Sequence, residues 1–189
     1  MELESKAIGL DAPVFLINTG NPLDSLTQDQ VVGIYTGEYT NWKDVGGADL
    51  PIVAYQRNKT SGSQVMVEAL VMQGAEMMEA PERLAPGLMD GLVSDIASYS
   101  NTANAIGYSV YYYVDNMYFE EGIKLLAIDG VAPTNESIAD GSYPWRQPFY
   151  AVIRASEPAD SPARQLYDWL TTEEGFALIE EAGYVAARS

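Results

Sequence analysis

The stretch Arg57-Asn58-Lys59-Thr60-Ser61-Gly62-Ser63-Gln64 is the segment around which the other elements of this sequence can be arranged. It follows a short apolar strand pattern over residues 51–55 and precedes a helical pattern over residues 62–73. A strand, a glycine-bearing loop and a helix, in this order, form the arrangement in which α/β folds place ligands. The stretch therefore predicts an α/β fold with a ligand site at the start of a helix.

The residue types in this stretch suit a small anion. A helix N-terminus has unpaired backbone N–H groups and the positive end of the helix dipole. Gly62 leaves that backbone bare, Ser61 and Ser63 add hydroxyl donors, and Arg57 offers a planar fork suited to an oxyanion. A structural interpretation is also open, because Ser61 and Gln64 have the S-x-x-Q spacing of a capping box, and caps occur at most helices.

The composition excludes several classes of function. The 189 residues include 27 acidic and 10 basic ones, a formal charge of −17, so a nucleic-acid partner is not expected. Neither His nor Cys occurs, which removes Ser-His-Asp and Cys-His catalysis, the usual zinc sites and disulfides. We expect no metal and no cofactor. Exposed charges are largely screened beyond about 8 Å at physiological salt, so the acidity does not exclude a local anion site.

An enzyme built from this sequence would depend on carboxylate, Lys, Tyr or Ser chemistry. A hydrolase with paired carboxylates could use Glu120, Glu121, Asp129 or Asp140. However, a glycosidase needs two carboxyl groups at a defined distance across a cleft, and the adjacent Glu120 and Glu121 point in different directions. We interpret the chain as a non-enzyme and assign no catalytic residue.

Strand and helix patterns alternate along the whole chain, which supports the α/β class. Turn residues interrupt the pattern near 18–22 and again near 143–148. These two hinge-like interruptions suggest that residues 1–17 form part of a first lobe, residues 18–145 form a second lobe, and residues 146–189 return to the first; one continuous sheet is the alternative. The individual elements expected are strands over 7–17, 105–108, 123–128 and 149–153, and helices over 27–35, 91–99, 134–139, 161–170 and 172–182. Thr27 and Gln30 have the capping-box spacing at the start of the first of these helices, Gly37 is expected to stop it, and Gly183 is expected to stop the last.

Three smaller expectations concern packing. Val65, Ala69 and Met72 share one stripe of the helix over 62–73 and predict its buried face. Trp42 is expected to pack inward as an anchor. Tyr111-Tyr112-Tyr113 could form a stacking platform for a sugar or base, but three adjacent positions cannot share one face, so at least one should be buried.

The order of motifs resembles the phosphate-binding proteins of phosphate ABC transporters, which have the type II periplasmic-binding-protein fold. The resemblance covers essentially the whole chain. It rests on the following residues in order: Asn21-Pro22, Leu26-Thr27, Ile34-Tyr35-Thr36-Gly37, Asn41-Trp42-Lys43-Asp44-Val45-Gly46-Gly47, Arg57-x-x-x-Ser61-Gly62-Ser63, Ala105-Ile106-Gly107-Tyr108 and Gly183-Tyr184-Val185.

This resemblance implies that Arg57, Ser61, Gly62 and Ser63 contact phosphate, with Ser63 at a position where family members commonly have threonine. It also implies a fold with one nearly complete lobe and part of the other. The family's N-terminal glycine loop and proton-accepting aspartate have no counterpart in this sequence, which predicts a half-site. Alternatives are a binder of another oxyanion such as sulfate, and an extracellular sensor or interaction module of the same fold.

The resemblance also decides the expected location and partners. No apolar run of 18 residues occurs, and Met1 to Lys6 lack the basic and apolar regions of a signal peptide. The family implies an extracellular or periplasmic protein, anchored as a lipoprotein through an N-terminal segment outside this chain. Its expected partners are inorganic phosphate and the membrane permease of an ABC transporter.

Overall fold

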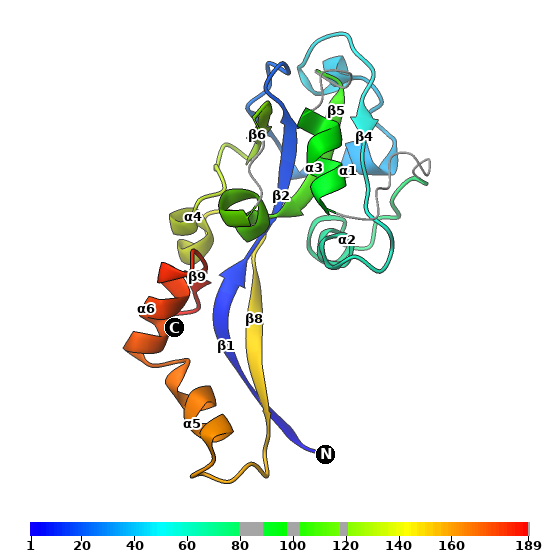
Figure 1. Cartoon of the computed structure of the whole chain (residues 1–189). Helices are drawn as coiled ribbons and strands as arrows, with labels where there is room; N and C mark the ends of the chain where they lie inside the picture. The colour runs from blue at the N-terminus through cyan, green and yellow to red at the C-terminus, as the bar shows by residue number, and fades with distance from the viewer. Residues whose placement is uncertain (80–88, 98–102, 118–120, 189) are drawn as a thin grey trace.

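The first extended segment of the chain contributes to two different sheets (Figure 1). The computed structural model describes residues 1–79, 89–97, 103–117 and 121–188. Strand β1 (Leu3–Asp11) and strand β2 (Pro13–Asn18) follow one another with Ala12 between them. The single strand expected over residues 7–17 is therefore wrong in one respect, because the extended chain changes its strand partners at Ala12.

The central sheet is built around β2. It has four strands among the described residues, in the spatial order β4 (Val53–Ala54), β5 (Ala105–Val110), β2 and β6 (Ile123–Leu125). Strand β2 is antiparallel to both β5 and β6, while β4 is parallel to β5. All six residues of β2 are buried. A strand buried on both faces reads as a continuous apolar run, which is why this strand was recognisable in the sequence.

Helices cover both faces of the central sheet. On one face, Phe15 of β2 contacts the rings of Tyr108 from β5 and Tyr35 from α1 (Gln28–Thr36). On the other face, Leu92 and Ile96 of α3 (Met89–Ala97) lie directly over Gly107 of β5. A side chain at Gly107 would overlap these two residues, so the glycine permits the close packing of helix on sheet.

The second sheet has the order β8 (Gln147–Arg154), β1 and β9 (Val185–Ala186), all antiparallel. In Figure 1, β1 and β8 run side by side away from the central sheet, with α5 (Pro162–Trp169) and α6 (Glu173–Glu181) along one side. The remaining elements are the parallel pair β3 (Ser25–Leu26) and β7 (Ala127–Ile128), the helices α2 (Gly62–Met66) and α4 (Asn135–Asp140), and the short helical turns η1 (Trp42–Val45), η2 (Val67–Val71) and η5 (Tyr113–Met117).

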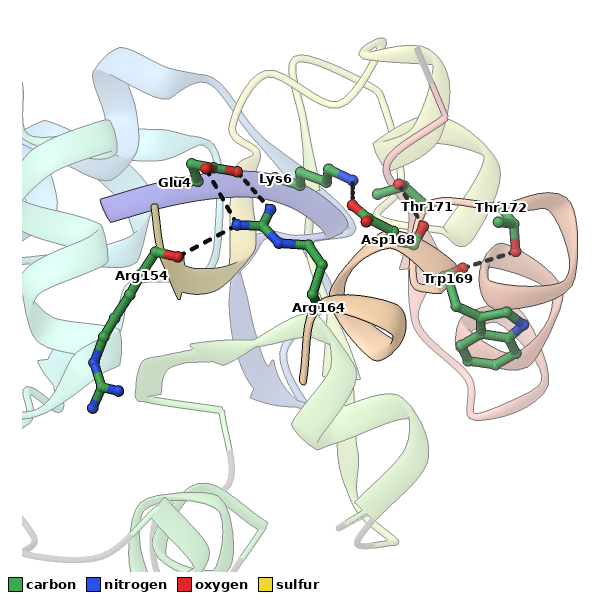
Figure 2. A network of polar contacts seen from close by, with 8 residues as sticks. All are labelled: Glu4, Lys6, Arg154, Arg164, Asp168, Trp169, Thr171 and Thr172. Atoms are coloured by element: carbon green, nitrogen blue, oxygen red, sulfur yellow. Dashed lines mark hydrogen bonds and ion pairs between the residues drawn. The ribbon is translucent and has the colours of Figure 1, made fainter. Parts of the chain in front are cut away.

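Ion pairs attach α5 to β1 (Figure 2). Arg164 donates to both carboxylate oxygens of Glu4, at 2.7 and 3.3 Å, and Lys6 donates to Asp168 at 2.7 Å. The hydrogen bond from Lys6 lowers the pKa of the Asp168 carboxyl. The Lys6 and Arg164 cations also lie over the Tyr167 ring, which is 4% exposed. Surface ion pairs contribute little stability on their own, so these contacts chiefly orient a helix that Tyr167 holds by burial.

Two connections join the two sheets. One is Ala12, and the other is the segment that leads from α4 through Tyr143 and Trp145 into β8. The buried Tyr143 hydroxyl donates to the carbonyl oxygen of Pro13 at 3.1 Å, which ties the two connections together. The lobe boundaries after residues 17 and 145 stay a prediction. Strand pairing favours placing the first one at Ala12, because β2 pairs with the strands of the central sheet.

Several local expectations are confirmed. Thr27 and Gln30 form both hydrogen bonds of a capping box at the start of α1, and Gly37 ends that helix with a left-handed φ of 82°. Trp42 is 1% exposed and donates to the carbonyl of Asn104 at 3.0 Å. Tyr111 is buried as required of at least one of the three tyrosines. Tyr112 stacks on Tyr184 at 3.4 Å between ring centroids, so one of its faces is already covered.

The expected buried stripe of the helix over 62–73 is wrong at Val65 and Ala69, which are exposed, and confirmed at Met72, which is buried. Val65 is 52% exposed, whereas Ser63, Gln64 and Val67 are buried. The helix also changes from α to π geometry at Val67, which shifts the later residues around the helix axis. The sequence pattern failed because two inward positions are polar.

The junction between α5 and α6 provides a test of this packing. A Cβ added at Gly175 would overlap the carbonyl oxygen of Trp169 and lie 2.8 Å from the carbonyl carbon of Leu170. Both are backbone atoms that cannot rotate away. We expect Gly175→Ala to lower the free energy of unfolding by about 1–3 kcal/mol in urea denaturation. The exposed neighbour Glu174→Ala is the control, and a loss at Gly175 no greater than at Glu174 would contradict the tight junction.

Candidate anion-binding site at the start of helix α2

The structure forms the strand, loop and helix that the sequence predicted around Arg57. Strand β4 pairs with β5 at the edge of the central sheet, and the chain then passes through Arg57 to the start of α2. Ser61 is the N-cap residue, with an extended backbone at φ −72° and ψ 135°. Its N–H donates to the carbonyl of Asn58 at 2.9 Å, which closes the preceding loop into a tight turn.

The first turn of α2 presents several hydrogen-bond donors. Within the described residues, no protein acceptor pairs with the backbone N–H groups of Gly62, Ser63 or Gln64. The hydroxyl oxygens of Ser61 and Ser63 lie 3.1 Å apart, so both are directed to the same region. A Cβ added at Gly62 would meet no atom within 4 Å. The helix start is therefore open to an approaching anion.

The capping-box interpretation of Ser61 and Gln64 is wrong. The Ser61 side chain makes no capping hydrogen bond to the helix. Gln64 is 3% exposed, and its side chain turns inward to accept from the backbone N–H of Arg57 at 3.2 Å and from the Tyr108 hydroxyl. Burial outweighed the local pattern, because the inward position lets Gln64 bond to two other elements. A cap therefore does not account for the hydroxyl of Ser61.

Two basic residues, Arg57 and Lys59, lie in the loop before this helix start, although the whole chain is acidic. Five basic residues elsewhere form ion pairs with carboxylates: Lys6, Lys43, Lys124, Arg164 and Arg188. Lys59 is exposed and forms no ion pair within the described part of the chain. Arg57 lies two residues before it. Two cations in one short loop favour an anion at this position, because the charges of distant carboxylates are screened.

A hollow of about 760 Å³ lies beside this segment, but it is not the same place. Arg57, Asn58, Lys59 and Gln64 line it, whereas Ser61, Gly62 and Ser63 do not. Its other walls include the three carboxylates Glu68, Glu76 and Glu79. Carboxylates repel an anion, so we place the candidate site at the open helix start and not inside the hollow.

Two of the four carboxylates proposed for a hydrolase, Asp129 and Asp140, have other contacts in the structure. Asp129 accepts from the side chain of Gln28 at 2.7 Å, and Asp140 accepts from the backbone of Ser142 at 2.8 Å. Both therefore stabilise turns or helix ends. Glu120 lies outside the described residues. Among the residues that are described, no group of three or more acidic side chains is placed to hold a metal ion.

Comparison with known proteins identifies the family. Residues 3–174 match the model of the PBP superfamily domain, and the chain belongs to this superfamily. The chain is 27% identical over 184 residues to the phosphate-binding protein PstS of Borreliella burgdorferi, a match that covers 95% of this chain. The chain spans 53–64% of the length of the first curated relatives that it matches, all of which are named phosphate-binding proteins.

Solved structures show the same fold. An ABC-type phosphate transport receptor from Vibrio cholerae matches with a TM-score of 0.79 and 27% identity over 97% of this chain and 72% of the receptor. A putative phosphate ABC transporter substrate-binding protein from Clostridium perfringens, solved with bound phosphate, matches with a TM-score of 0.78 and 26% identity over 98% of this chain and 72% of its own. These matches confirm the resemblance and the periplasmic-binding-protein-like α/β fold. The relatives are binding proteins and receptors, in agreement with a non-enzymatic chain.

The role of Ser61 can be separated from that of an ordinary helix cap. Thr134 caps α4 through both bonds of a capping box with Ser137, whereas Ser61 makes no such bond. We expect Thr134→Ala to lower the free energy of unfolding by about 1 kcal/mol and Ser61→Ala to lower it by less than about 0.5 kcal/mol, as measured by urea denaturation. Equal losses for the two variants would mean that Ser61 has a structural cap function after all.

Proposed function

We propose that this protein binds inorganic phosphate at the start of α2, through Arg57, Ser61, Gly62 and Ser63, and delivers it to the permease of an ABC transporter. The observation that carries the proposal is the open helix start, where backbone N–H groups and two serine hydroxyls lie close together a few residues after Arg57 in the chain. Relatives named as phosphate-binding proteins, one of them solved with phosphate, support this ligand. Such a role requires no covalent chemistry.

In the proposed site, all the donors contact the anion from one side. Each hydrogen bond to a charged ligand contributes about 1.5–3 kcal/mol, against the large cost of removing phosphate from water. Donors on one wall leave the other side of the anion in water, so we propose that Arg57 to Ser63 form a half-site. We expect a chain that also supplies donors on the facing side of the anion to bind phosphate more tightly than these 189 residues do.

The proposed location follows from the proposed role. A receptor that delivers phosphate to a permease works outside the membrane, so we propose an extracellular or periplasmic location with attachment through a lipoprotein anchor. None of the helices within the described residues combines the length and apolar character needed to cross a membrane. Labelling of intact cells with an antibody against the protein would test this location.

Titration calorimetry with phosphate, on the complete gene product, tests the site. We expect Arg57→Ala to weaken binding about 10- to 100-fold, because it removes charged donors to the anion. Arg154→Ala is the matched control, since Arg154 is an exposed arginine on β8. We expect its phosphate affinity to equal that of the unchanged protein. Equal affinity of the Arg57 and Arg154 variants would refute the site.

Gly62→Ala separates binding from folding. The added methyl group meets no protein atom, so we expect the free energy of unfolding to stay the same or to rise by up to about 1 kcal/mol. We expect phosphate binding to weaken, because the methyl group takes space at the helix start. The same titrations with sulfate identify the anion: tighter binding of sulfate than of phosphate would replace phosphate as the proposed ligand.

A further inference from the structure

We propose that Gln64, together with Tyr108, positions Arg57 for anion binding. The inference rests on the proposed function of the segment from Arg57 to Ser63, and it adds two residues that do not themselves face the ligand. Both are buried, at 3% exposure for Gln64 and 0% for Tyr108. They lie behind the open helix start, on the side of the central sheet. Their contacts connect α2, β5 and the loop that carries Arg57.

Gln64 uses its whole hydrogen-bonding capacity. Its amide oxygen accepts from the backbone N–H of Arg57 at 3.2 Å and from the hydroxyl of Tyr108. Its amide nitrogen donates to the carboxylate of Glu68 at 2.7 Å and lies 3.3 Å from the sulfur of Met77. A glutamine amide has two acceptor positions and two donor hydrogens, so all four are occupied. A fully satisfied buried polar network holds one geometry, because any rotation would leave a group unpaired.

Glu68 determines which way the amide of Gln64 points. An ionised carboxylate can only accept hydrogen bonds, so the NH2 group of Gln64 must face Glu68. The amide oxygen is then directed toward Arg57 and Tyr108. Because Glu68 follows Gln64 by four residues, both lie on one side of the same helix, and the helix itself sets the orientation.

Tyr108 connects this point to the core of the sheet. Its hydroxyl accepts from the backbone N–H of Arg57 at 2.9 Å, and its ring packs edge-on against Phe15 and Tyr35. Burial raises the pKa of the Tyr108 hydroxyl above its ordinary value, so the group stays protonated and keeps its hydrogen for Gln64. This hydrogen bond therefore attaches the backbone of Arg57 to β5, an inner strand of the central sheet.

The consequence concerns the backbone of Arg57. Its N–H is shared between an acceptor on α2 and an acceptor on β5, so the distance from Arg57 to the helix start cannot vary freely. A binding group that is held in position loses less freedom when the ligand arrives, and the site gains affinity. Gln64 and Tyr108 are therefore positioning residues, and Arg57 is the residue that contacts the anion.

Two variants test the proposal in the complete gene product. Tyr108→Phe removes the hydroxyl and keeps the ring in the core, while Gln64→Leu removes all the hydrogen bonds of the amide. Tyr143→Phe is the matched control, because Tyr143 is equally buried and its hydroxyl donates to Pro13 instead. Amide hydrogen exchange of Arg57, measured by NMR, reports on the bond directly. Calorimetry with phosphate reports on its effect.

We expect Tyr108→Phe to weaken phosphate binding about 2- to 10-fold and Gln64→Leu to weaken it more, each with faster exchange at the Arg57 amide. Tyr143→Phe should lose stability without changing either quantity. Loss of affinity without faster exchange at Arg57, or equal affinities for Tyr108→Phe and Tyr143→Phe, would overturn the positioning role while leaving the proposed function intact. Absence of phosphate binding by the unchanged protein would instead overturn the proposed function, and the inference with it.

Discussion

The constraint on which the rest of this structure depends is the burial of β2 between two antiparallel neighbours. All six residues of β2 are buried, and the strand pairs with β5 on one side and with β6 on the other. A shift of one residue would turn every side chain of the strand to the opposite face, so its register is strongly fixed. Strand β1 leads directly into β2 through Ala12, so the position of the second sheet also depends on β2.

The candidate site depends on this strand through a short series of contacts. Phe15 of β2 lies opposite Tyr108 of β5 in the strand register, and the hydroxyl of Tyr108 bonds to the backbone of Arg57 and to Gln64. The proposed anion site at the start of α2 is thus connected through Tyr108 to the buried central sheet. A formal charge of −17 is compatible with the proposed anion site, because a few fixed donors act at short range, where screening does not weaken them.

Gln30 and Gln64 each follow a hydroxyl residue by three positions, and the two cases show where a local sequence pattern predicts the structure and where it does not. Thr27 and Gln30 form the expected capping box at an exposed helix start. Ser61 and Gln64 have the same spacing but do not form it, because the inward side of α2 gives Gln64 partners on β5 and on the preceding loop. The capping-box spacing predicts the contacts correctly when only water competes for the side chains. It fails when buried groups far along the chain compete for the same side chain.

The sequence by itself determined the alternation of strands and helices, the buried run of β2, the helix stops at Gly37 and Gly183, and the family with its motif from Arg57 to Ser63. These features depend on neighbouring residues, whose spacing is visible in one dimension. Only the tertiary structure decided that the chain changes sheets at Ala12, that α2 buries Gln64 and exposes Val65, and that Tyr108 supports Arg57. The residues that pair between β1 and β8 are up to 151 positions apart in the sequence, as in the pair of Leu3 with Arg154.

 Arg57 and Tyr108 are 51 positions apart, and Gln64 and Tyr108 are 44 apart. Contacts over such distances depend on how the sheets pack, and no local pattern of residues records them, which is the physical reason that only the folded chain could show them.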